Sequence, residues 1–436
     1  MIVILGGGES GIGAALLAKK RGLPVFVSDN GKIHDHFVNE LVEAEIDFEQ
    51  EGHDFIFDLT PELVVKSPGI LDQAEAVIYF KEQSIEIISE IEFAFRYVNG
   101  ILVGITGSNG KTTTTNLMYH LLHSARKDVV KCGNVGYSFA RAVAGRDHSF
   151  YVIELSSFQL DGIVHFRPNI GILLNITPDH LDRYDNDFEK YISSKWRIFR
   201  NQLSEDYAIV NTKDKVLAET LSSQNLAANE IQIDASLNAL QILKDHQEYL
   251  VNLSDSTLRG QHNAVNAACA IRAAQILGLE SSSIQEAVTS FVNDPHRMEL
   301  VLEHDGVRWI NDSKATNVDS VYWALDSLSG NIIWIAGGLD KGNDYTAIQD
   351  LVRTKVKAIV ALGKKNEAIL TAFRDVVERV YDTHDMESAI KIVKGIAEFQ
   401  DTVLLSPACA SFDLFQNYEH RGNSFKDQIK KQIQRS

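Results

Sequence analysis

The sequence predicts an α/β protein with mostly parallel sheets, divided into three domains. Short apolar runs rich in β-branched residues alternate with segments of helical periodicity along the whole chain, which is typical of this class. With 436 residues, the chain also exceeds what one hydrophobic core usually holds. New α/β runs begin near Phe93 and near Asp294, so we expect domains at residues 1–93, 94–295 and 296–436.

Each domain has its own predicted strands. In the N-terminal domain, where we also expect a helix at Ser10–Arg21, the strands are Ile2–Leu5, Val25–Ser28, Phe55–Asp58, Leu63–Lys66 and Glu86–Ser89. In the central domain they are Ile101–Thr106, Tyr151–Leu155 and Ile170–Ile176. In the C-terminal domain they are Val307–Ile310, Ile332–Ala336, Ala358–Leu362 and Val403–Leu405.

The composition, with 44% hydrophobic and 23% charged residues, is that of a soluble globular protein. The three cysteines share no disulfide or metal spacing, which favours a reducing compartment. The chain shows neither a signal-peptide pattern nor an apolar run long enough to span a membrane. A net charge of −17 without a Lys/Arg cluster argues against a nucleic-acid partner. We therefore expect a cytoplasmic protein that binds neither nucleic acid nor membrane.

A glycine-rich loop, Gly107-Ser108-Asn109-Gly110-Lys111-Thr112, lies between the strand at Ile101–Thr106 and a helical pattern. Small residues let backbone N–H groups turn toward phosphate oxygens, and the helix N-terminus adds the positive end of its dipole. Lys111 is then expected at the β- and γ-phosphates, and the Thr112 hydroxyl on Mg²⁺. Ile105 stands where the strict P-loop pattern has glycine, yet the strand–loop–helix context indicates an ATP-type site.

Two further polar side chains follow predicted strands. Glu154 lies at the end of the strand Tyr151–Leu155, and His180 follows the strand Ile170–Ile176. In open α/β sheets ligands collect at the carboxyl ends of strands, where the phosphate loop also lies. Because the metal of a nucleotide needs oxygen or imidazole ligands beyond the phosphates, Glu154 and His180 are candidate Mg²⁺ ligands. Taken singly, each also fits a strand-end cap or an ordinary structural histidine.

Lys195 occupies the wrong face of its predicted helix for a solvated lysine. At about 100° per residue, it falls near the centre of an apolar face formed by Phe188, Tyr191, Ile192, Trp196 and Phe199. One interpretation is a snorkelling side chain whose ammonium group reaches water. The other is a buried amine of lowered pKa, which can react with CO₂ and form a carbamate able to hold a second Mg²⁺.

Amide and charged side chains suited to a nucleotide occur further along the chain. Asn263 and Asn266 lie three residues apart at the start of an Ala-rich helical segment, so their amides share a face. Their donors and acceptors suit a nucleobase edge, although capping of the first helical turn explains them equally well. Asp312 can accept from ribose hydroxyls, whereas Arg297 and Lys314 can neutralise phosphate charge in a transition state.

The first predicted strand leads into Gly6-Gly7-Gly8-Glu9-Ser10-Gly11-Ile12-Gly13, which contains the pattern GxGxxG, and Asp29 ends the next strand. By itself this pattern suggests a dinucleotide-binding fold and hence an NAD-dependent dehydrogenase. It establishes only that a diphosphate can rest on a helix N-terminus, and UDP offers the same diphosphate. A downstream ATP site with metal ligands does not suit a dehydrogenase.

Several contiguous motifs resemble the Mur ligases over essentially the whole chain. The resemblance of the ATP-binding core lies in the phosphate loop, in Glu154–Leu160 and in Asn175–Tyr184. A closer resemblance, to the D-glutamate-adding members of that family, is found in Asn311–Asn317 and in Ser406–Asp413 with Tyr418, Arg421 and Gly422. The DNPR motif of diaminopimelate-adding members is absent. The resemblance implies a Rossmann-like UDP-binding domain, a central P-loop-type ATPase domain and a mobile Rossmann-like C-terminal domain.

The resemblance also assigns roles to single residues. It places ATP on Gly107, Ser108, Asn109, Gly110, Lys111, Thr112 and Thr113, with Asn263 and Asn266 at the adenine and Arg297, Asp312 and Lys314 on the nucleotide. It gives two Mg²⁺ ions the residues Thr112, Glu154, His180 and a carbamylated Lys195. It places the substrates on Gly8, Ser10, Asp29, Asn30, Asn134, Ser157, Tyr418 and, for D-glutamate, Thr316, Lys341 and Ser411.

The implied enzyme is a monomeric ATP-dependent ligase of peptidoglycan precursor synthesis. Its substrates would be UDP-N-acetylmuramoyl-L-alanine and D-glutamate, with ATP and Mg²⁺ required. The alanine carboxylate would become an acyl phosphate that the amine of D-glutamate attacks, while closure of the C-terminal domain excludes water. Three alternatives stay open at this point: a folylpolyglutamate synthetase-like ligase, a dehydrogenase, and a non-catalytic nucleotide-binding regulator.

Overall fold

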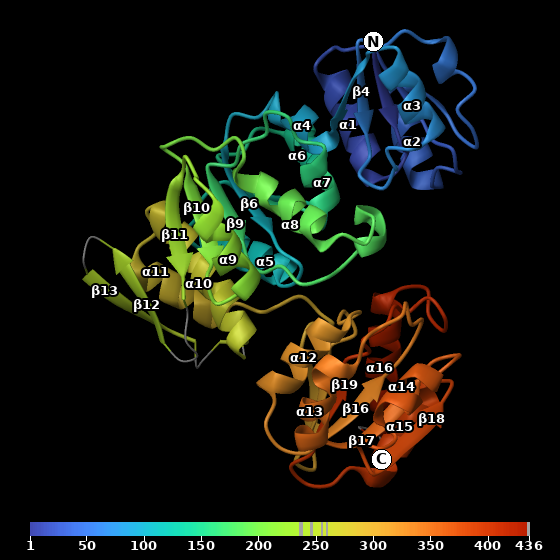
Figure 1. The fold of residues 1–436 in the computed structure, drawn as a ribbon, viewed down its shortest axis with the longest axis vertical. Coiled ribbons are helices and arrows are strands. Elements are labelled where there is room, and N and C mark those ends of the chain that lie inside the picture. Colours follow the sequence, from blue (N-terminus) through green and yellow to red (C-terminus); the bar gives the residue numbers. More distant parts are fainter. Residues whose placement is uncertain (235–238, 245–246, 254–255, 259, 434–436) are drawn as a thin grey trace. The chain divides into compact units, whose positions relative to one another are not determined.

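A computed structural model describes residues 1–436 apart from 235–238, 245–246, 254–255, 259 and 434–436, and no side chain within 235–250 is described. The described chain forms two compact units, Met1–Ser254 with Val265–Phe291, and Asp255–Ala264 with Val292–Ser436 (Figure 1). The three-domain boundaries expected from the sequence stay predictions. Within this described part, no helix is both long and apolar enough to cross a membrane.

The N-terminal sheet is parallel, with the strand order β3-β2-β1-β4-β5. Its middle strand, β1, is buried along its whole length, as expected for a strand covered by helices on both faces. The chain passes directly from β1 into α1 through the glycine-rich turn. The elements are β1 (Ile2–Leu5), α1 (Glu9–Lys20), β2 (Val25–Ser28), α2 (Asp35–Glu43), β3 (Asp47–Glu49), η1 (Ile56–Asp58), β4 (Leu63–Lys66), α3 (Glu75–Glu82), β5 (Glu86–Ser89) and α4 (Glu90–Phe95).

The central sheet is also parallel, with the order β11-β10-β9-β6-β8-β7. Because β9, β6 and β8 are neighbours, the loops that follow them meet at one edge of the sheet. The strands are β6 (Ile101–Thr106), β7 (Val129–Gly133), β8 (Phe150–Glu154), β9 (Ile170–Leu173), β10 (Tyr207–Asn211) and β11 (Asn229–Ile233). The backbone of β12 (Ala239–Lys244) and β13 (Gln247–Asn252) forms a separate antiparallel hairpin.

Helices surround the central sheet. Helix α5 is the next element after β6 in the chain, and the predicted phosphate loop lies between them (Figure 1). The helical elements are α5 (Lys111–Ser124), α6 (Phe139–Gly145), α7 (Ser157–Asp161), η2 (Leu181–Tyr184), α8 (Phe188–Trp196), η3 (Arg197–Phe199), α9 (Lys215–Ser223), α10 (Gln261–Ile276) and α11 (Ser281–Ser290).

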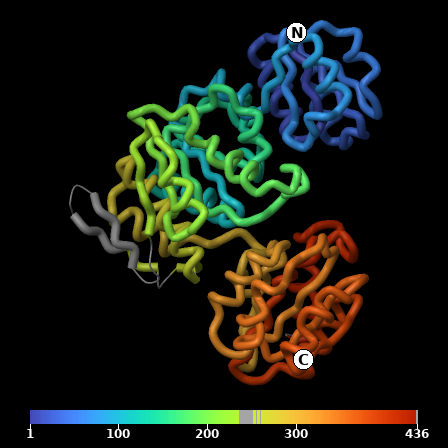
Figure 2. Tube along the Cα trace, viewed as in Figure 1, coloured from blue at the N-terminus to red at the C-terminus, as the bar shows by residue number. Residues whose placement is uncertain are grey.

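The C-terminal sheet has the order β14-β15-β19-β16-β17-β18, and only the β14–β15 pair is antiparallel. Figure 2 traces the chain of this unit in orange and red. Successive residues of its strands point to opposite faces, so Trp334 joins one buried core and Ile335 the other. The elements are β14 (Glu299–His304), β15 (Val307–Asn311), α12 (Val318–Ser327), β16 (Ile332–Ala336), α13 (Thr346–Lys355), β17 (Val356–Leu362), α14 (Glu367–Phe373), β18 (Arg379–Thr383), α15 (Met386–Ile396), β19 (Thr402–Leu405) and α16 (Tyr418–Gln432).

One predicted strand is wrong. Phe55–Asp58 was expected to be a strand, but Ile56–Asp58 forms the 3₁₀ turn η1. The Glu49 carboxylate accepts the backbone N–H groups of Phe55 (2.8 Å) and Ile56 (3.3 Å). A side chain therefore satisfies backbone donors that a strand would have paired with a neighbouring strand.

Candidate active site

The phosphate-loop candidate is a tight turn between β6 and α5. Gly110, which precedes the first helical residue, has φ +82°, a left-handed conformation that strains any other side chain. A Cβ at Gly110 would also lie 2.4 Å from the amide oxygen of Asn266 on α10. The backbone and the neighbouring helix both require glycine here. Asn266, which is buried, therefore lies directly against the loop.

The loop after β9 braces this turn. The backbone N–H of Asn109 donates to the side-chain oxygen of Asn175 (2.8 Å), and the Asn175 amide donates to the Asn109 carbonyl (3.0 Å). The Ser108 N–H donates to the Asn175 carbonyl (3.0 Å), and its hydroxyl donates to the Thr177 carbonyl (2.9 Å). Because β9 neighbours β6, the loop conformation depends on two strand ends and not on α5 alone.

Two lysine amines meet at the carbonyl oxygen of Gly107. The Lys195 amine donates to this oxygen at 2.8 Å, and the Lys111 amine donates to the same oxygen at 2.8 Å and to the Ser108 carbonyl at 2.8 Å. The Lys111 ammonium group makes the turn electropositive, which suits an anion such as a triphosphate. The structure thus brings Lys111, Lys195 and the glycine-rich turn together.

Lys195 is 2% exposed, as its place on the apolar face of α8 predicts. Its amine lies 4.7 Å from the centre of the Tyr191 ring and does not reach water, so the snorkelling interpretation is wrong. Burial, followed by the nearby charge of Lys111, lowers the pKa of this amine well below its ordinary value. The opposing, pKa-raising charges belong to Asp179, Asp161 and Glu154.

The Glu154 carboxylate, at the end of β8, is 1% exposed and has only one partnered oxygen. The Asn134 amide donates to Oε1 at 2.8 Å, whereas Oε2 is buried without a hydrogen-bond partner. A buried carboxylate oxygen without a donor is costly, and a hard cation satisfies it. Glu154 therefore fits a metal ligand, and Asn134 orients it.

The surroundings fit a nucleotide-bound magnesium ion better than a protein-caged metal. Thr112 and Thr113 are buried in the first turn of α5. In the part of the chain that the structure describes, no group of three or more His, Cys, Asp or Glu side chains is arranged to hold a metal. A magnesium ion at this edge would take oxygens from Glu154 and Thr112 and complete its shell with phosphate and water oxygens.

His180 is the most exposed of the predicted catalytic residues, with 55% of its side chain accessible. Its backbone is left-handed (φ 52°), its ring packs edge-on against Phe158 (5.3 Å between centroids), and Nε2 lies 3.6 Å from the Asp179 carboxylate. Its place after β9 agrees with the prediction from the sequence, and its role as a metal ligand stays a prediction.

The predicted substrate residue Ser157 is buried at the start of α7, and its carbonyl accepts from the Ser194 hydroxyl (3.0 Å).

In the N-terminal sheet, Asp29 ties the glycine-rich turn to the loop after β2. One carboxylate oxygen accepts the N–H of Gly7 (2.6 Å), and the other accepts the N–H of Gly31 (2.7 Å). The turn and the acid at the end of the second strand are thus brought together, as the pattern predicts. The other predicted substrate residues here are the α1 N-cap Gly8, the first-turn residue Ser10 and the exposed Asn30.

Asp312 is buried just after β15 in the C-terminal unit. Its carboxylate accepts from the Ser406 hydroxyl (2.8 Å) and from the backbone N–H of Met298 (3.2 Å). Burial raises the pKa of the Asp312 carboxyl to about 7, against the opposing effect of these hydrogen bonds and of the charges on Arg297 and Arg421. This carboxyl therefore titrates near neutral pH.

Three neighbouring strands carry the predicted D-glutamate residues. Thr316 follows β15, Lys341 follows β16 and Ser411 follows β19; Ser411 is buried, and the other two are exposed. These strands lie in the order β15-β19-β16 and run parallel, so the three loops share one edge. The Lys314 amine lies 3.8 Å from the centre of the Tyr418 ring, a cation–π contact near the same loops.

Asn263, which was predicted at the adenine, is buried in the first turn of α10.

Two residues without an assigned role brace loops, one in each compact unit. Asn175 braces the phosphate loop, as described above. The buried Arg421 guanidinium donates to the Ser313 carbonyl (2.8 Å), the Ser313 hydroxyl (3.0 Å) and the Cys409 carbonyl (3.0 Å). Asn175 could have been found as the first polar residue after an apolar strand next to β6. No spacing could connect Arg421, on the last helix, to loops so distant in sequence.

The chain matches family models over most of its length. Residues 105–274 match the Mur ligase middle domain, and residues 296–409 match the Mur ligase, glutamate ligase domain. A UDP-N-acetylmuramoylalanine–D-glutamate ligase of Christiangramia forsetii is 45% identical over 98% of this chain and 99% of its own length. The ligase of the same name from Porphyromonas gingivalis is 46% identical over 98% of both chains.

The chain belongs to the Mur ligase family.

Solved Mur ligase structures share its fold. The UDP-N-acetylmuramate-alanine ligase MurC of Thermotoga maritima is 18% identical, with a TM-score of 0.62 over 99% of both chains. A pseudomurein peptide ligase type C of Methanothermus fervidus is 19% identical, with a TM-score of 0.64 over 99% of both chains. The MurF ligase of Thermotoga maritima, in complex with ADP, gives 0.63 at 14% identity over 94% of this chain and 96% of its own. The predicted α/β class is confirmed.

Replacing Asp312 with asparagine should change how the stability of this Mur ligase depends on pH. Its folded-state pKa of about 7 exceeds the unfolded value of about 3.9, so the folded state binds this proton more tightly. Wild type should lose stability as pH rises from about 4 through about 7, by about 1.4 kcal/mol per unit. Asp312→Asn should lack this loss. Thermal unfolding midpoints from about pH 5 to about pH 8 check it, and parallel profiles would contradict it.

Proposed function

We propose that this Mur ligase joins the amine of D-glutamate to the alanine carboxylate of UDP-N-acetylmuramoyl-L-alanine, with ATP, as a step of cytoplasmic peptidoglycan precursor synthesis. The observation that carries the proposal is the electropositive turn at Gly107, with the amines of Lys111 and Lys195 on its carbonyl and the buried Glu154 carboxylate at the adjoining strand end. Relatives of matching length that are named for this activity support the choice of substrates.

The turn would hold the triphosphate of ATP, and Mg²⁺ would supply charge neutralisation between the phosphates. Lys111 would neutralise the charge that develops during phosphoryl transfer, because its amine is already held at the turn. The free Glu154 oxygen and the Thr112 hydroxyl would hold the metal. Asn266 lies against the loop, which supports a place for it beside the nucleotide.

The chemistry balances as two displacements. An oxygen of the acceptor carboxylate bonds to the γ-phosphorus, the bond to ADP breaks, and an acyl phosphate forms. The nitrogen of D-glutamate then bonds to the acyl carbon, phosphate leaves with the bonding electrons, and the nitrogen loses a proton. The chain contributes by holding the reactants in line and by excluding water from the acyl phosphate.

Lys195 would act as a carbamate. Its neutral amine can attack CO₂, so that an N–C bond forms and a proton leaves, and a buried neutral amine becomes an anion. That conversion would place a negative group beside the Lys111 ammonium group, which attracts it. The carbamate oxygens, together with His180, would serve a second Mg²⁺ ion.

A substrate panel tests the proposed function. Phosphate release is measured with ATP and UDP-N-acetylmuramoyl-L-alanine, in the absence and in the presence of D-glutamate, L-glutamate, D-aspartate or L-lysine. We expect release to depend on D-glutamate and an amide product to form in equal amount. Release without an amide product would indicate a non-catalytic regulator that hydrolyses ATP. Preference for L-glutamate on a folate acceptor would indicate the folylpolyglutamate-type ligase.

Replacing Lys111 with alanine should abolish ATP turnover, with a loss of at least about 100-fold in kcat, because a preorganised positive charge is removed from the phosphates. The matched control is Lys127→Ala, an exposed lysine just beyond the end of α5, which should retain activity. Phosphate release measures both variants. Wild-type rates in Lys111→Ala would remove the phosphate-loop assignment.

Replacing Lys195 with alanine should inactivate the enzyme but permit partial rescue by acetate or formate, which supply carboxylate oxygens in place of the carbamate. The control is Lys190→Ala, since Lys190 lies on the exposed face of the same helix and pairs with Asp185 at 2.7 Å. Amide formation is measured across a range of added carboxylic acid. Full activity of Lys195→Ala without any acid would dispose of the carbamate.

A further inference from the structure

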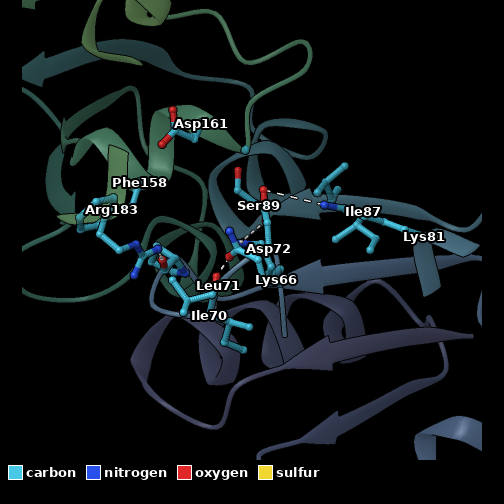
Figure 3. A pocket seen from close by; sticks show the side chains of 14 residues that line it. Lys66, Ile70, Leu71, Asp72, Lys81, Ile87, Ser89, Phe158, Asp161 and Arg183 are labelled. Carbon is cyan, nitrogen blue, oxygen red and sulfur yellow. Dashed lines mark hydrogen bonds and ion pairs between the residues drawn. The ribbon is translucent and has the colours of Figure 1, made fainter. Parts of the chain in front are cut away.

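Arg183 connects the loop after β9 to the N-terminal sheet. Its guanidinium donates to the carbonyl of Pro68 (3.2 Å) and to the carbonyl of Gly69 (3.3 Å). These carbonyls belong to residues 67–70, which follow β4 and are called the β4 loop here. Figure 3 shows the Arg183 side chain reaching toward the segment that carries Ile70 and Leu71. One planar fork of donors therefore holds two consecutive peptide units.

The β4 loop lies directly against the glycine-rich turn after β1. A Cβ at Gly6 would be 2.6 Å from the Ser67 hydroxyl oxygen, so the two segments are in close contact. That hydroxyl is buried and has no hydrogen-bond partner. The Lys66 amine donates to the Ile70 carbonyl (2.7 Å) and closes the β4 loop on itself. The position of the β4 loop therefore bears directly on the turn where the glycine-rich pattern predicts a diphosphate.

The Arg183 guanidinium also lies over an aromatic ring on α7. Its central carbon lies 4.4 Å from the centre of the Phe158 ring. That ring also packs against His180 (5.3 Å) and stacks on Tyr184 (6.0 Å). The Tyr184 hydroxyl donates to Asp161 (2.9 Å), which fixes the aromatic group on α7. Arg183 is thus held between the β4 loop and the aromatic residues beside the ends of β8 and β9.

The partners of Arg183 carry no charge. Two carbonyls and an aromatic ring hold it, and within the described chain no carboxylate lies within ion-pair distance. The side chain also lines a cavity of about 270 Å³ between the β4 loop and α7. Neutral partners fix the geometry of the fork without cancelling its charge, which suits a residue beside an anionic substrate.

We infer that Arg183 is a positioning residue for the acceptor nucleotide, because it clamps the β4 loop and the glycine-rich turn to the Phe158 side of the central sheet. The inference rests on the proposed function and on the sequence expectation that the diphosphate of UDP rests on the glycine-rich turn after β1, while the acceptor carboxylate reaches the ATP site. One substrate then contacts both sheets. A loosened clamp lowers the fraction of enzyme in which both ends are aligned, and small misalignments cost much of the rate.

Arg183→Met tests the clamp, because methionine keeps an apolar stem on Phe158 but lacks the fork of donors. The KM for UDP-N-acetylmuramoyl-L-alanine should rise about tenfold, which corresponds to about 1.4 kcal/mol. The KM values for ATP and D-glutamate should stay within about twofold of the wild-type values, which is a much smaller change in free energy than the tenfold rise for the acceptor. Arg183→Lys keeps the charge without the fork and should recover only part of the affinity.

The matched control is Arg96→Met. Arg96 is also half-buried and pairs with Glu86 (2.7 Å) at the amino end of β5, so its loss should leave all three KM values unchanged. An unchanged acceptor KM in Arg183→Met would overturn the inference. An equal loss in every kinetic constant together with a lowered unfolding temperature would also overturn it, because that pattern marks a structural role.

The same comparison is made without turnover by calorimetric titration of UDP-N-acetylmuramoyl-L-alanine into wild type and Arg183→Met. The variant should bind this nucleotide about tenfold more weakly, and equal affinity would contradict the clamp. If wild type binds the acceptor but does not use D-glutamate, the proposed function fails while the clamp stands.

Discussion

The carbonyl oxygen of Gly107, which accepts from the amines of both Lys111 and Lys195, is the constraint on which the rest of the site depends. Two amines can share one buried oxygen only if one of them is neutral or an anion lies nearby. Burial lowers the pKa of Lys195 and so favours the neutral form. The turn is therefore prepared for a polyanion before any ligand binds, and Glu154 offers an unsatisfied oxygen to the metal that accompanies such a ligand.

Parallel sheets account for how this site is assembled from distant parts of the sequence. The neighbours β9, β6 and β8 place Asn175, the glycine-rich turn and Glu154 at one edge, because all their carboxyl ends point the same way. The same rule places the loops after β15, β19 and β16 together in the C-terminal unit. Backbone hydrogen bonds between loops then fix each turn, as Asn175 does for Asn109.

The sequence predicted most of the buried strands, because their apolar patterns are local. Most of the strands that escaped prediction are the edge strands β3, β7, β11, β14 and β18; the interior strand β10 and the hairpin strands β12 and β13 escaped as well. An edge strand is partly solvated, so its apolar signal is weak, as in Asn229–Ile233. Lys195 was predictable because helical spacing alone places it on an apolar face. Arg183 and Arg421 were not, because their roles come from backbone carbonyls, which carry no side-chain signature.

The most direct test of the account is a crystal structure with Mg²⁺ and a non-hydrolysable ATP analogue. The account predicts phosphate oxygens on the backbone N–H groups of residues 110–112, the Lys111 amine moved from the Gly107 carbonyl to a phosphate, and the Glu154 carboxylate on the metal. A nucleotide bound elsewhere, with both lysine amines still on the Gly107 carbonyl and Glu154 Oε2 unligated, would contradict it.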